Sequence, residues 1–467
     1  NGRLYQGFAI PEFYEINKDF YRTNKEKAYF ALGLEYDCCS DCTEIFPHRI
    51  HYSQQSFQEE LTDNYRTFLP NNYRDIDGET GEITNLFKIQ DSLFVHTEEG
   101  LWNLPQNIKR RQVDEVVSYI GTGSYFENPP KKIIEGNNGM SAGLKHRESV
   151  LHCEHGYFFV CESQKKILQF TGANLVPISD IGMIKWFRDN IGQSKKGDNP
   201  SNPNSSGFIS SYDSFNNRIL FTKKDKNGIN DISWTLSFDL ISRKWISFHS
   251  YLPNMYFYTP NKLYSWIYGN NNIWKHNVKG KYQSFYGKKY PFIVEYVSLS
   301  SPLQTKVFDA IQLICNAEKY DTLLNEFVDV DNVFFNKLIA YNSRQCTGEL
   351  NIRIKQKNQT PWYAITESLS EITASKNERV WSLNTLRDIR TDYDKPIFDS
   401  NPSNPVIQQN YYIDKILNTN SMSFQKNWNE LENLRDKYLQ VRLIFDNLDE
   451  AKLSLDFSSE NEKISIR

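Results

Sequence analysis

The sequence predicts a mainly β protein, in which a β-propeller, complete or incomplete in this chain, is followed by an antiparallel β-sandwich. Three observations support this prediction. Aromatic residues make up 14% of the chain, mostly as 28 Tyr and 30 Phe, and these side chains favour the half-buried pleated surface of strands. Long helical periodicity is nearly absent. Short apolar stretches alternate instead with turns rich in Asn, Gly, Asp and Lys.

Four segments share one form: an apolar strand, a polar turn, and a second strand with a large side chain near its start. They span residues 93–104, 157–170, 235–248 and 264–275, and each is typical of a β-hairpin. A single hairpin is marginal in water, so several must stack. Repeated hairpins with aromatics at matching places are typical of propeller blades. The alternative is a set of ordinary hairpins in a sandwich.

The tryptophans of these hairpins, Trp102, Trp245 and Trp274, are therefore predicted to pack within blades rather than to contact a ligand. The spacing of the hairpins is uneven, and the Asn-, Pro- and Ser-rich insertion at 199–206 explains part of that irregularity.

One short helix is predicted at 181–190. Ser179 or Asp180 is expected to cap its first turn, and Met183, Trp186 and Phe187 are expected to share one face.

After residue 285 the strands become longer and alternate more cleanly, at 292–297, 348–355, 438–445 and 452–457. Such a period of two, with one polar face, suits an antiparallel sandwich. We therefore predict a propeller-like domain at 1–285 and a sandwich-like domain at 286–467. The segments 321–335 and 392–406 are acidic or rich in Pro and Asn, and we expect loops or insertions there.

Length and charge limit the classes of function. A chain of 467 residues suggests two or three domains at about 150 residues each. The formal net charge of −3 does not indicate a strongly basic groove for nucleic acid. Because the chain holds no run of 18 apolar residues, we expect no membrane span.

The start of the chain, Asn1-Gly2-Arg3-Leu4, has neither an initiator Met nor the features of a signal peptide. We therefore expect a fragment or a processed product of a longer chain. Seven cysteines are sparse and odd in number, which favours reduced thiols and folding in a reducing compartment.

The sharpest local cluster is formed by Cys38, Cys39 and Cys42. Cys39 and Cys42 have the C-x-x-C spacing of zinc and redox sites. Zinc needs two further ligands, which Cys153, His152 or His155 would have to supply in space. Redox motifs open a helix in a βαβ context. Neither feature is evident, so we expect structural cysteines and leave metal binding by these three open.

Other candidate clusters also favour structural interpretations. His152-Cys153-Glu154-His155 lies at the bend of a predicted hairpin, and we expect a solvated turn. The glycine-rich runs at 121–124 and 136–143 lack the strand, helix and Lys-Ser/Thr of a phosphate cradle. The segment 96–102 loosely resembles a sialidase box, which is itself a structural hairpin device. No Ser-His-Asp order is recognisable, so no catalytic, cofactor-binding or metal residues are assigned, and no cofactor or enzymatic activity is expected.

Basic pairs recur along the chain, and solvated loop ends are the expected explanation, with contact to DNA phosphates as the functional alternative. They are Lys109-Arg110-Arg111, Lys131-Lys132, Lys165-Lys166, Lys195-Lys196, Lys223-Lys224 and Lys288-Lys289.

The order of short motifs along the chain resembles the muzzle proteins of crAss-like bacteriophages, also called stabilization proteins. The motifs are 179–183 with Trp186-Phe187, Ser211-Tyr212-Asp213 with 218–222, 235–239, 244–251 with Pro253, 384–388 and the strand 438–443. The resemblance extends from about Gly7 to the C-terminus and is strongest over 139–251. The cysteine cluster and the acidic stretch 321–331 do not map onto the family.

The resemblance implies a structural virion protein. Its expected role is to form a homo-oligomeric ring at the distal end of the portal–tail channel, which helps to retain genome and cargo until ejection. The implied partners are other tail proteins, such as portal-side ring, hub or fibre proteins, and DNA contacted non-specifically in the channel. The resemblance also implies that the protein is assembled in the bacterial host cytoplasm and lies in the tail of the virion. A carbohydrate-binding or sialidase-like glycosidase propeller is the competing hypothesis, which predicts Trp or Tyr and paired acids in one central pocket.

Overall fold

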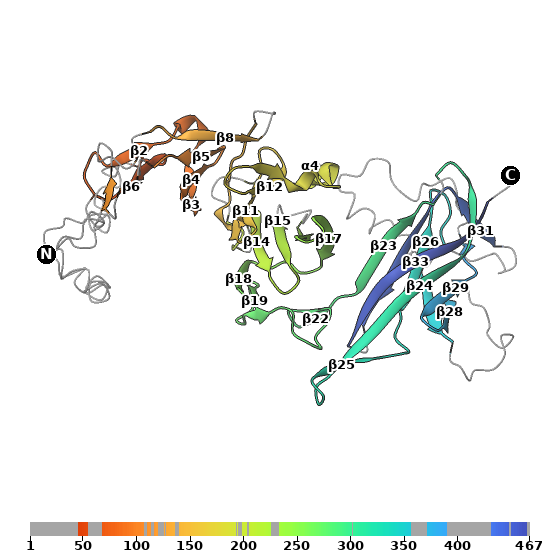
Figure 1. Cartoon of the computed structure of the whole chain (residues 1–467). Coiled ribbons are helices and arrows are strands. Elements are labelled where there is room, and N and C mark those ends of the chain that lie inside the picture. Colours follow the sequence, from red (N-terminus) through yellow and green to blue (C-terminus); the bar gives the residue numbers. More distant parts are fainter. Residues whose placement is uncertain are drawn as a thin grey trace. The chain divides into compact units, whose positions relative to one another are not determined.

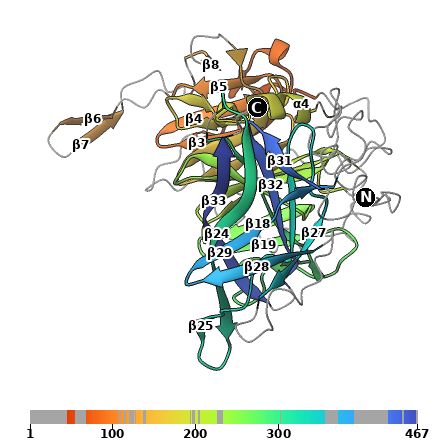
Figure 2. The same ribbon diagram turned by 90° about the vertical axis from the view of Figure 1, so that its right-hand side faces the viewer.

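The chain forms two compact units, one from Asn1–Tyr212 and Ile219–Ser247, the other from Asp213–Arg218 and Phe248–Arg467 (Figures 1 and 2). A computed structural model describes residues 45–54, 68–106, 110–113, 116–119, 126, 128–135, 140–192, 194, 199–202, 205–225, 233–300, 302–355, 371–389, 431–447 and 450–464. Strands dominate these residues, which confirms the mainly β prediction.

The first unit begins with small sheets. The pair β1–β2 is followed by a five-stranded sheet in the order β3-β4-β5-β8-β9 and by the hairpin β6–β7. Their bounds are β1 (Arg49–His51), β2 (Tyr73–Asp75), β3 (Ile83–Ile89), β4 (Ser92–Thr97), β5 (Gly100–Leu104), β6 (Arg110–Val113), β7 (Val116–Tyr119), β8 (Lys131–Glu135) and β9 (Met140–Ser141), with short 3-10 turns at Gly78–Thr80 and Arg147–Ser149.

Two four-stranded sheets follow, each with its strands in sequence order. They consist of β10 (Leu151–Cys153), β11 (Gly156–Cys161), β12 (Lys166–Phe170) and β13 (Leu175–Pro177), and of β14 (Gly207–Asp213), β15 (Arg218–Lys224), β16 (Trp234–Asp239) and β17 (Lys244–His249). The tip of the β14–β15 hairpin, Asp213–Arg218, belongs to the second unit. All four hairpins predicted from the sequence are present, as β4–β5, β11–β12, β16–β17 and β19–β20.

The predicted helix is shorter than expected. It begins at Ile184, as α4 (Ile184–Asn190), and its N-cap is Met183, which makes no side-chain capping hydrogen bond. A 3-10 turn occupies Ile178–Asp180, and Gly182, with φ +74°, separates that turn from the helix. The predicted cap by Ser179 or Asp180 is therefore wrong, because the left-handed backbone at Gly182 interrupts the helix.

The helix still presents the expected apolar face. Phe187 is fully buried, and Met183 and Trp186 pack against the same cluster. Trp245 lies 4.6 Å from Phe187 between ring centroids and donates its Nε1–H to the carbonyl oxygen of Ile178 at 3.0 Å. Trp102 lies in another buried cluster of the same unit. Both tryptophans pack within the protein, and their place in propeller blades stays a prediction.

The second unit contains a three-stranded sheet, β18 (Met255–Thr259), β19 (Lys262–Trp266) and β20 (Trp274–Lys275), and the pair β21 (Ser284–Phe285) and β22 (Lys288–Lys289). Trp274 packs edge-on against Tyr286, with ring centroids 5.8 Å apart, which agrees with its predicted packing role.

The rest of the second unit is an 11-stranded sheet in the order β23-β32-β26-β27-β28-β29-β24-β31-β30, in which β25 and β33 also pair with β24. Its strands are β23 (Phe292–Ser298), β24 (Lys306–Asp321), β25 (Glu326–Asp329), β26 (Lys337–Tyr341), β27 (Leu350–Ile354), β28 (Glu371–Asn377), β29 (Val380–Asn384), β30 (Arg387–Asp388), β31 (Glu432–Asp436), β32 (Leu439–Phe445) and β33 (Ala451–Ile464). The pairing is antiparallel except between β27 and β28.

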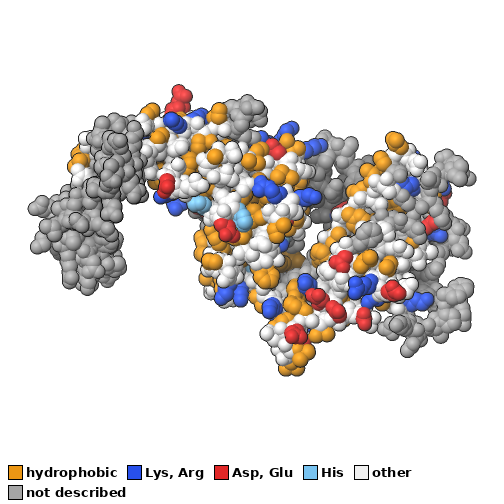
Figure 3. All heavy atoms as spheres, in the orientation of Figure 1, with side chains coloured by type: hydrophobic (Ala, Val, Ile, Leu, Met, Phe, Trp, Pro, Cys, Tyr) orange, Lys and Arg blue, Asp and Glu red, His pale blue; other side chains and the backbone are white. Residues whose placement is uncertain are grey.

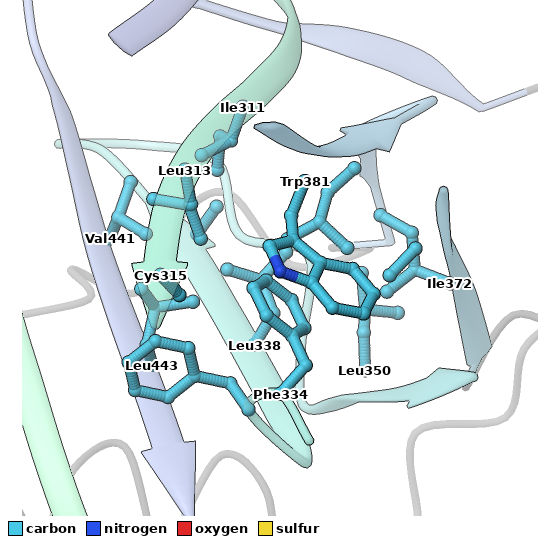
Figure 4. Packing of buried hydrophobic residues seen from close by; sticks show 14 of the residues in the cluster. Ile311, Leu313, Cys315, Phe334, Leu338, Leu350, Ile372, Trp381, Val441 and Leu443 are labelled. Atoms are coloured by element: carbon cyan, nitrogen blue, oxygen red, sulfur yellow. The ribbon is translucent and has the colours of Figure 1, made fainter. Parts of the chain in front are cut away.

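The sheet surrounds one large apolar core, to which β24, β26, β27, β28, β29 and β32 each contribute (Figure 4). Trp381 of β29 stacks on Phe334, with ring centroids 4.4 Å apart. The alternating burial of β24 places Leu313 in this core, while Gln312 faces outward. The period of two expected for strands of this region thus places one face of each strand in the core.

Several expectations need correction or stay open. The predicted loop at 321–335 contains the strand β25, paired with β24 as a hairpin, because polar and acidic residues also occupy exposed strands. The segment 392–406 lies outside the described residues. The consecutive antiparallel sheets of 83–275 resemble blades, but no closed propeller is shown by the described residues, so propeller and sandwich stay predictions. The expected boundary at 285/286 also stays a prediction.

Candidate functional site

The cysteine cluster at Cys38, Cys39 and Cys42 and the glycine-rich run at 121–124 lie outside the described residues. Within the described part of the chain, no group of three or more His, Cys, Asp or Glu side chains is placed to hold a metal ion. No helix there is long and apolar enough to cross a membrane.

The segment 152–155 forms the turn between β10 and β11, as predicted. The side chains of His155 and Glu154 are largely exposed, and His155 Nε2 lies 3.5 Å from Glu154 Oε1. Partial burial raises the pKa of the Cys153 thiol, which disfavours the thiolate that nucleophilic or metal chemistry requires. This cluster is a turn whose His155 and Glu154 side chains reach solvent.

The sialidase-like segment 96–102 forms the β4–β5 hairpin. His96 is fully buried and lies 2.9 Å from the hydroxyl of Tyr157 through Nδ1. Burial lowers the pKa of His96 to about 3, so the ring is neutral at physiological pH. Trp102 is buried as well. The segment therefore packs inside the unit, in agreement with a structural role.

A buried Ser–His–Glu cluster was not predicted from the sequence. Nε2 of His146 lies 2.5 Å from Oγ of Ser194 and 3.1 Å from Oε1 of Glu162. Burial acts to raise the pKa of Glu162, but hydrogen bonds from His146 and Ser194 outweigh it, and the pKa is lowered. In a catalytic triad the acid and the nucleophile contact different ring nitrogens. Here both contact the same nitrogen, so the cluster satisfies buried polar groups and does not activate the serine.

Asp213, from one of the motifs of the family resemblance, is a buried hydrogen-bond centre of the second unit. Its carboxylate accepts bonds from Arg218 Nε at 2.9 Å, Asn216 Nδ2 at 2.7 Å and Asn277 Nδ2 at 2.7 Å. Asp213 is 1% exposed. A carboxylate with three donors, one of them a guanidinium, has a structural role, because its acceptor sites are occupied by the protein itself.

The basic pairs have different environments. Lys288 and Lys289 are exposed on β22. Lys223 and Lys224 are buried in β15, where Lys223 Nζ donates to the carbonyl oxygen of Asn190 at 3.0 Å and lies 3.1 Å from Asp225. The expectation of a solvated loop end was wrong for this pair, because local acceptors satisfy the ammonium group. Lys109 and the pair Lys195-Lys196 lie outside the described residues.

An apolar surface covers one face of the β18–β19 pair. The register places Met255 opposite Trp266 and Phe257 opposite Tyr264, and opposite residues share a face of the sheet. Met255 and Phe257 are exposed, Phe257 at 44%, and Tyr264 and Trp266 are half-buried. We call these four residues the β18–β19 apolar face.

A second apolar surface is the end of the β24–β25 hairpin. Leu323 is 94% exposed and Leu324 is 63% exposed; we call this pair the leucine tip. The hairpin projects from its sheet in both ribbon views (Figures 1 and 2), and hydrophobic side chains gather at its end (Figure 3). Sequence reasoning missed this surface within the predicted loop 321–335, although two adjacent leucines in a polar turn were a visible signal.

These observations define a mainly β protein with apolar surfaces suited to contact with other proteins. A family model described as the Crassvirus muzzle protein matches residues 9–269, and a second, described as the Crassvirus muzzle protein C-terminal domain, matches residues 280–388. The chain therefore belongs to the Crassvirus muzzle protein family, as the motif order predicted. This is a family of structural virion proteins rather than enzymes.

A curated relative extends the comparison. The chain is 23% identical over 382 residues to the "Muzzle protein" of Bacteroides phage crAss001, and the match covers 80% of this chain and 24% of that protein. The chain thus spans about a quarter of the length of the curated relative that it matches.

Proposed function

We propose that the chain is a subunit of a homo-oligomeric ring in the tail of a bacteriophage virion, at the distal end of the portal–tail channel. There it helps to retain the genome and cargo until ejection. The observation that carries this proposal is the pair of family matches, which cover residues 9–269 and 280–388. The exposed β18–β19 apolar face and leucine tip support it, because contiguous exposed apolar residues mark sites of contact with other proteins.

We propose that the ring is built from heterologous contacts between identical subunits. A heterologous contact between two different surfaces of identical subunits closes into a ring when its rotation closes. Neighbouring tail proteins, such as portal-side ring, hub or fibre proteins, then contact the remaining surfaces. The propeller at 1–285, the sandwich at 286–467 and assembly in the host cytoplasm are part of the same proposal.

The near-neutral charge of the chain, formally −3, suits a passage through which DNA slides. Each phosphate neutralised by a basic side chain adds salt-dependent affinity, so a strongly basic lining would retain DNA by binding it. We propose that contact with DNA in the channel is non-specific and weak.

The competing carbohydrate hypothesis predicts aromatic side chains and paired acids in one pocket. Trp102 and Trp245 instead pack in buried clusters of the first unit. A glycan array with a reproducible sugar hit, together with hydrolysis that is lost on an acid-to-amide change, would favour that hypothesis over the tail proposal.

Antibody labelling of intact particles in the electron microscope tests the proposed function. We expect label at the distal end of the tail, and particles labelled with an antibody to the major capsid protein serve as the positional control. Label on the capsid shell, or a chain absent from purified particles, would contradict the proposal.

A further inference from the structure

We propose that the leucine tip of one copy docks on the β18–β19 apolar face of a second copy. This inference rests on the proposed self-assembly of the chain and names the two surfaces that make the contact. Both surfaces belong to the second unit, so each copy offers both halves of the interface.

The leucine tip is held in a fixed conformation. Oδ1 of Asp321 accepts hydrogen bonds from the backbone N–H groups of Leu323, at 2.8 Å, and Leu324, at 3.3 Å. The hydroxyl of Tyr320 donates a hydrogen bond to Oδ1 of Asn325. The ring of Tyr320 packs against that of Phe327, with ring centroids 5.2 Å apart. The turn therefore presents both leucines to solvent without the entropy cost of ordering a flexible loop on binding.

The β18–β19 apolar face offers a receptor of matching chemistry. Its four side chains lie on two adjacent strands in direct register, while Leu263 and Ser265 point into the protein. Aromatic residues and methionine are enriched where proteins contact one another. The face thus supplies large apolar surface without rearrangement of its backbone.

Charge selects a second copy as the occupant. Residues 318–329 of the hairpin contain four acidic residues and one basic residue, whereas residues 255–275 contain two lysines and no acidic residue. The acidic residues are Glu318, Asp321, Glu326 and Asp329, and the lysines of the β18–β19–β20 sheet are Lys262 and Lys275. Glu318 pairs with Lys452 of its own chain at 3.2 Å, so Asp321, Glu326 and Asp329 supply the charge for a second copy. The acidic residues of the β24–β25 hairpin disfavour its binding to an anionic lipid surface. They complement Lys262 and Lys275 beside the β18–β19 apolar face.

The contact forms between copies and not within one. Leu323 is 94% exposed and Phe257 is 44% exposed, so neither surface covers the other in a single chain. Because tip and receptor are different surfaces, their contact is heterologous, which is the type that builds rings.

Sedimentation of the full chain over a range of concentrations tests the contact. We expect Leu323→Asp with Leu324→Asp to weaken self-association by about tenfold or more. Leu303→Asp is the matched control, since Leu303 is 91% exposed outside both surfaces, and it is expected to leave association unchanged. Circular dichroism verifies that all variants fold.

Charge reversal supplies an independent test. Glu326→Lys with Asp329→Lys, and separately Lys262→Glu with Lys275→Glu, are each expected to weaken association, and the combination is expected to restore it. Repulsion between like charges explains the losses, and restored attraction explains the recovery. A structural defect in either surface would not be rescued by the combination.

Photo-crosslinking from position 324, in mixed isotope-labelled and unlabelled chains, identifies the contact directly. Crosslinks between copies to residues 255–275 support the inference. Crosslinks to another surface, crosslinks within one copy, or a chain that stays monomeric at every concentration overturn it. A ring that forms unchanged in the leucine variant also overturns it, while the proposed function, tested by labelling of particles, then stands.

Discussion

At the residue scale, several buried polar side chains of the described residues are fixed by hydrogen bonds from residues distant in the sequence. Asp213 is the clearest example, since Arg218, Asn216 and Asn277 all donate to its carboxylate. A buried carboxylate costs desolvation energy that only complete hydrogen bonding offsets. The arrangement therefore holds the tip of the β14–β15 hairpin to the segment that contains Asn277.

We expect Asp213→Asn to lower the stability of the second unit by about 2 kcal/mol, because the amide removes the charge that pairs with Arg218 and presents donors to donors. Urea unfolding followed by tryptophan fluorescence measures the change. Glu432→Gln is the control, since Glu432 is exposed on β31 of the same unit, and it should shift the midpoint little. Equal midpoints for the two variants would contradict the assigned role of Asp213.

A buried histidine adds a pH dependence at the same scale. Burial, with Arg218 and His276 nearby, lowers the pKa of His249 to about 3. Its Nε2 is buried without a hydrogen-bond partner among the described residues. Above about pH 6.5 the ring is neutral in both the folded and the unfolded chain. Between about pH 6.5 and 3 only the unfolded chain binds the proton, so stability falls as the pH falls.

For His249→Phe we expect a shallower loss of stability on acidification, by about 1.4 kcal/mol per pH unit within that window. Phe keeps the ring contact with Tyr251, whose centroid lies 5.2 Å away. Urea midpoints at several pH values between 7 and 4 measure the slope. Parallel slopes for wild type and variant would show that His249 is protonated in the folded state.

At the scale of elements, one close backbone approach joins residues 143–144 to the β4–β5 hairpin. Gly143 illustrates this, since a Cβ there would lie 2.5 Å from the Cα of Glu99 and closer still to the carbonyl oxygen of Glu98. The next residue, Leu144, donates its N–H to the carbonyl oxygen of Thr97 at 3.0 Å. The glycine therefore allows the chain to pass against the β4–β5 turn.

We expect Gly143→Ala to destabilise the first unit by about 1–3 kcal/mol or more, because the backbone of the β4–β5 turn must shift to admit the methyl group. Gly192→Ala is the matched control, since its Cβ would meet only the flexible end of Lys223 at 3.5 Å. Thermal unfolding compares the two variants. A Gly143→Ala midpoint equal to that of the control would contradict this account of the glycine.

At the scale of the whole molecule, the two units have separate cores. Phe187 is fully buried in a cluster of the first unit, whereas Trp381 is buried in the core of the 11-stranded sheet. Each core draws its side chains from its own unit, so each can in principle unfold cooperatively by itself.

We expect calorimetry to resolve two transitions that respond separately. Phe187→Ala should lower the transition temperature of the first unit, and Trp381→Ala that of the second. Each substitution should lower the free energy of unfolding of its unit by about 3–5 kcal/mol, because each leaves a large cavity. The two variants serve as controls for each other. A single transition that both substitutions lower equally would indicate one cooperative molecule.

The sequence alone determined the strand-rich fold class, the four hairpins and the family. Alternation and turn residues are local signals, which is why β4–β5 and β11–β12 appear where they were predicted. Motif order identified the family without any structure, because it records the succession of elements and not their contacts. The solvated turn at 152–155 was predictable for the same local reason.

Tertiary structure decided what distant residues do together. Only the fold brings Asn277 to Asp213 and His146 to Glu162, since neither pair has a sequence spacing that signals contact. Burial of Lys223, the pairing of β24 with β33 and the exposure of the leucine tip also depend on neighbours remote in the chain. Hydrogen bonding and burial are set by what packs nearby in space, so local patterns cannot specify them.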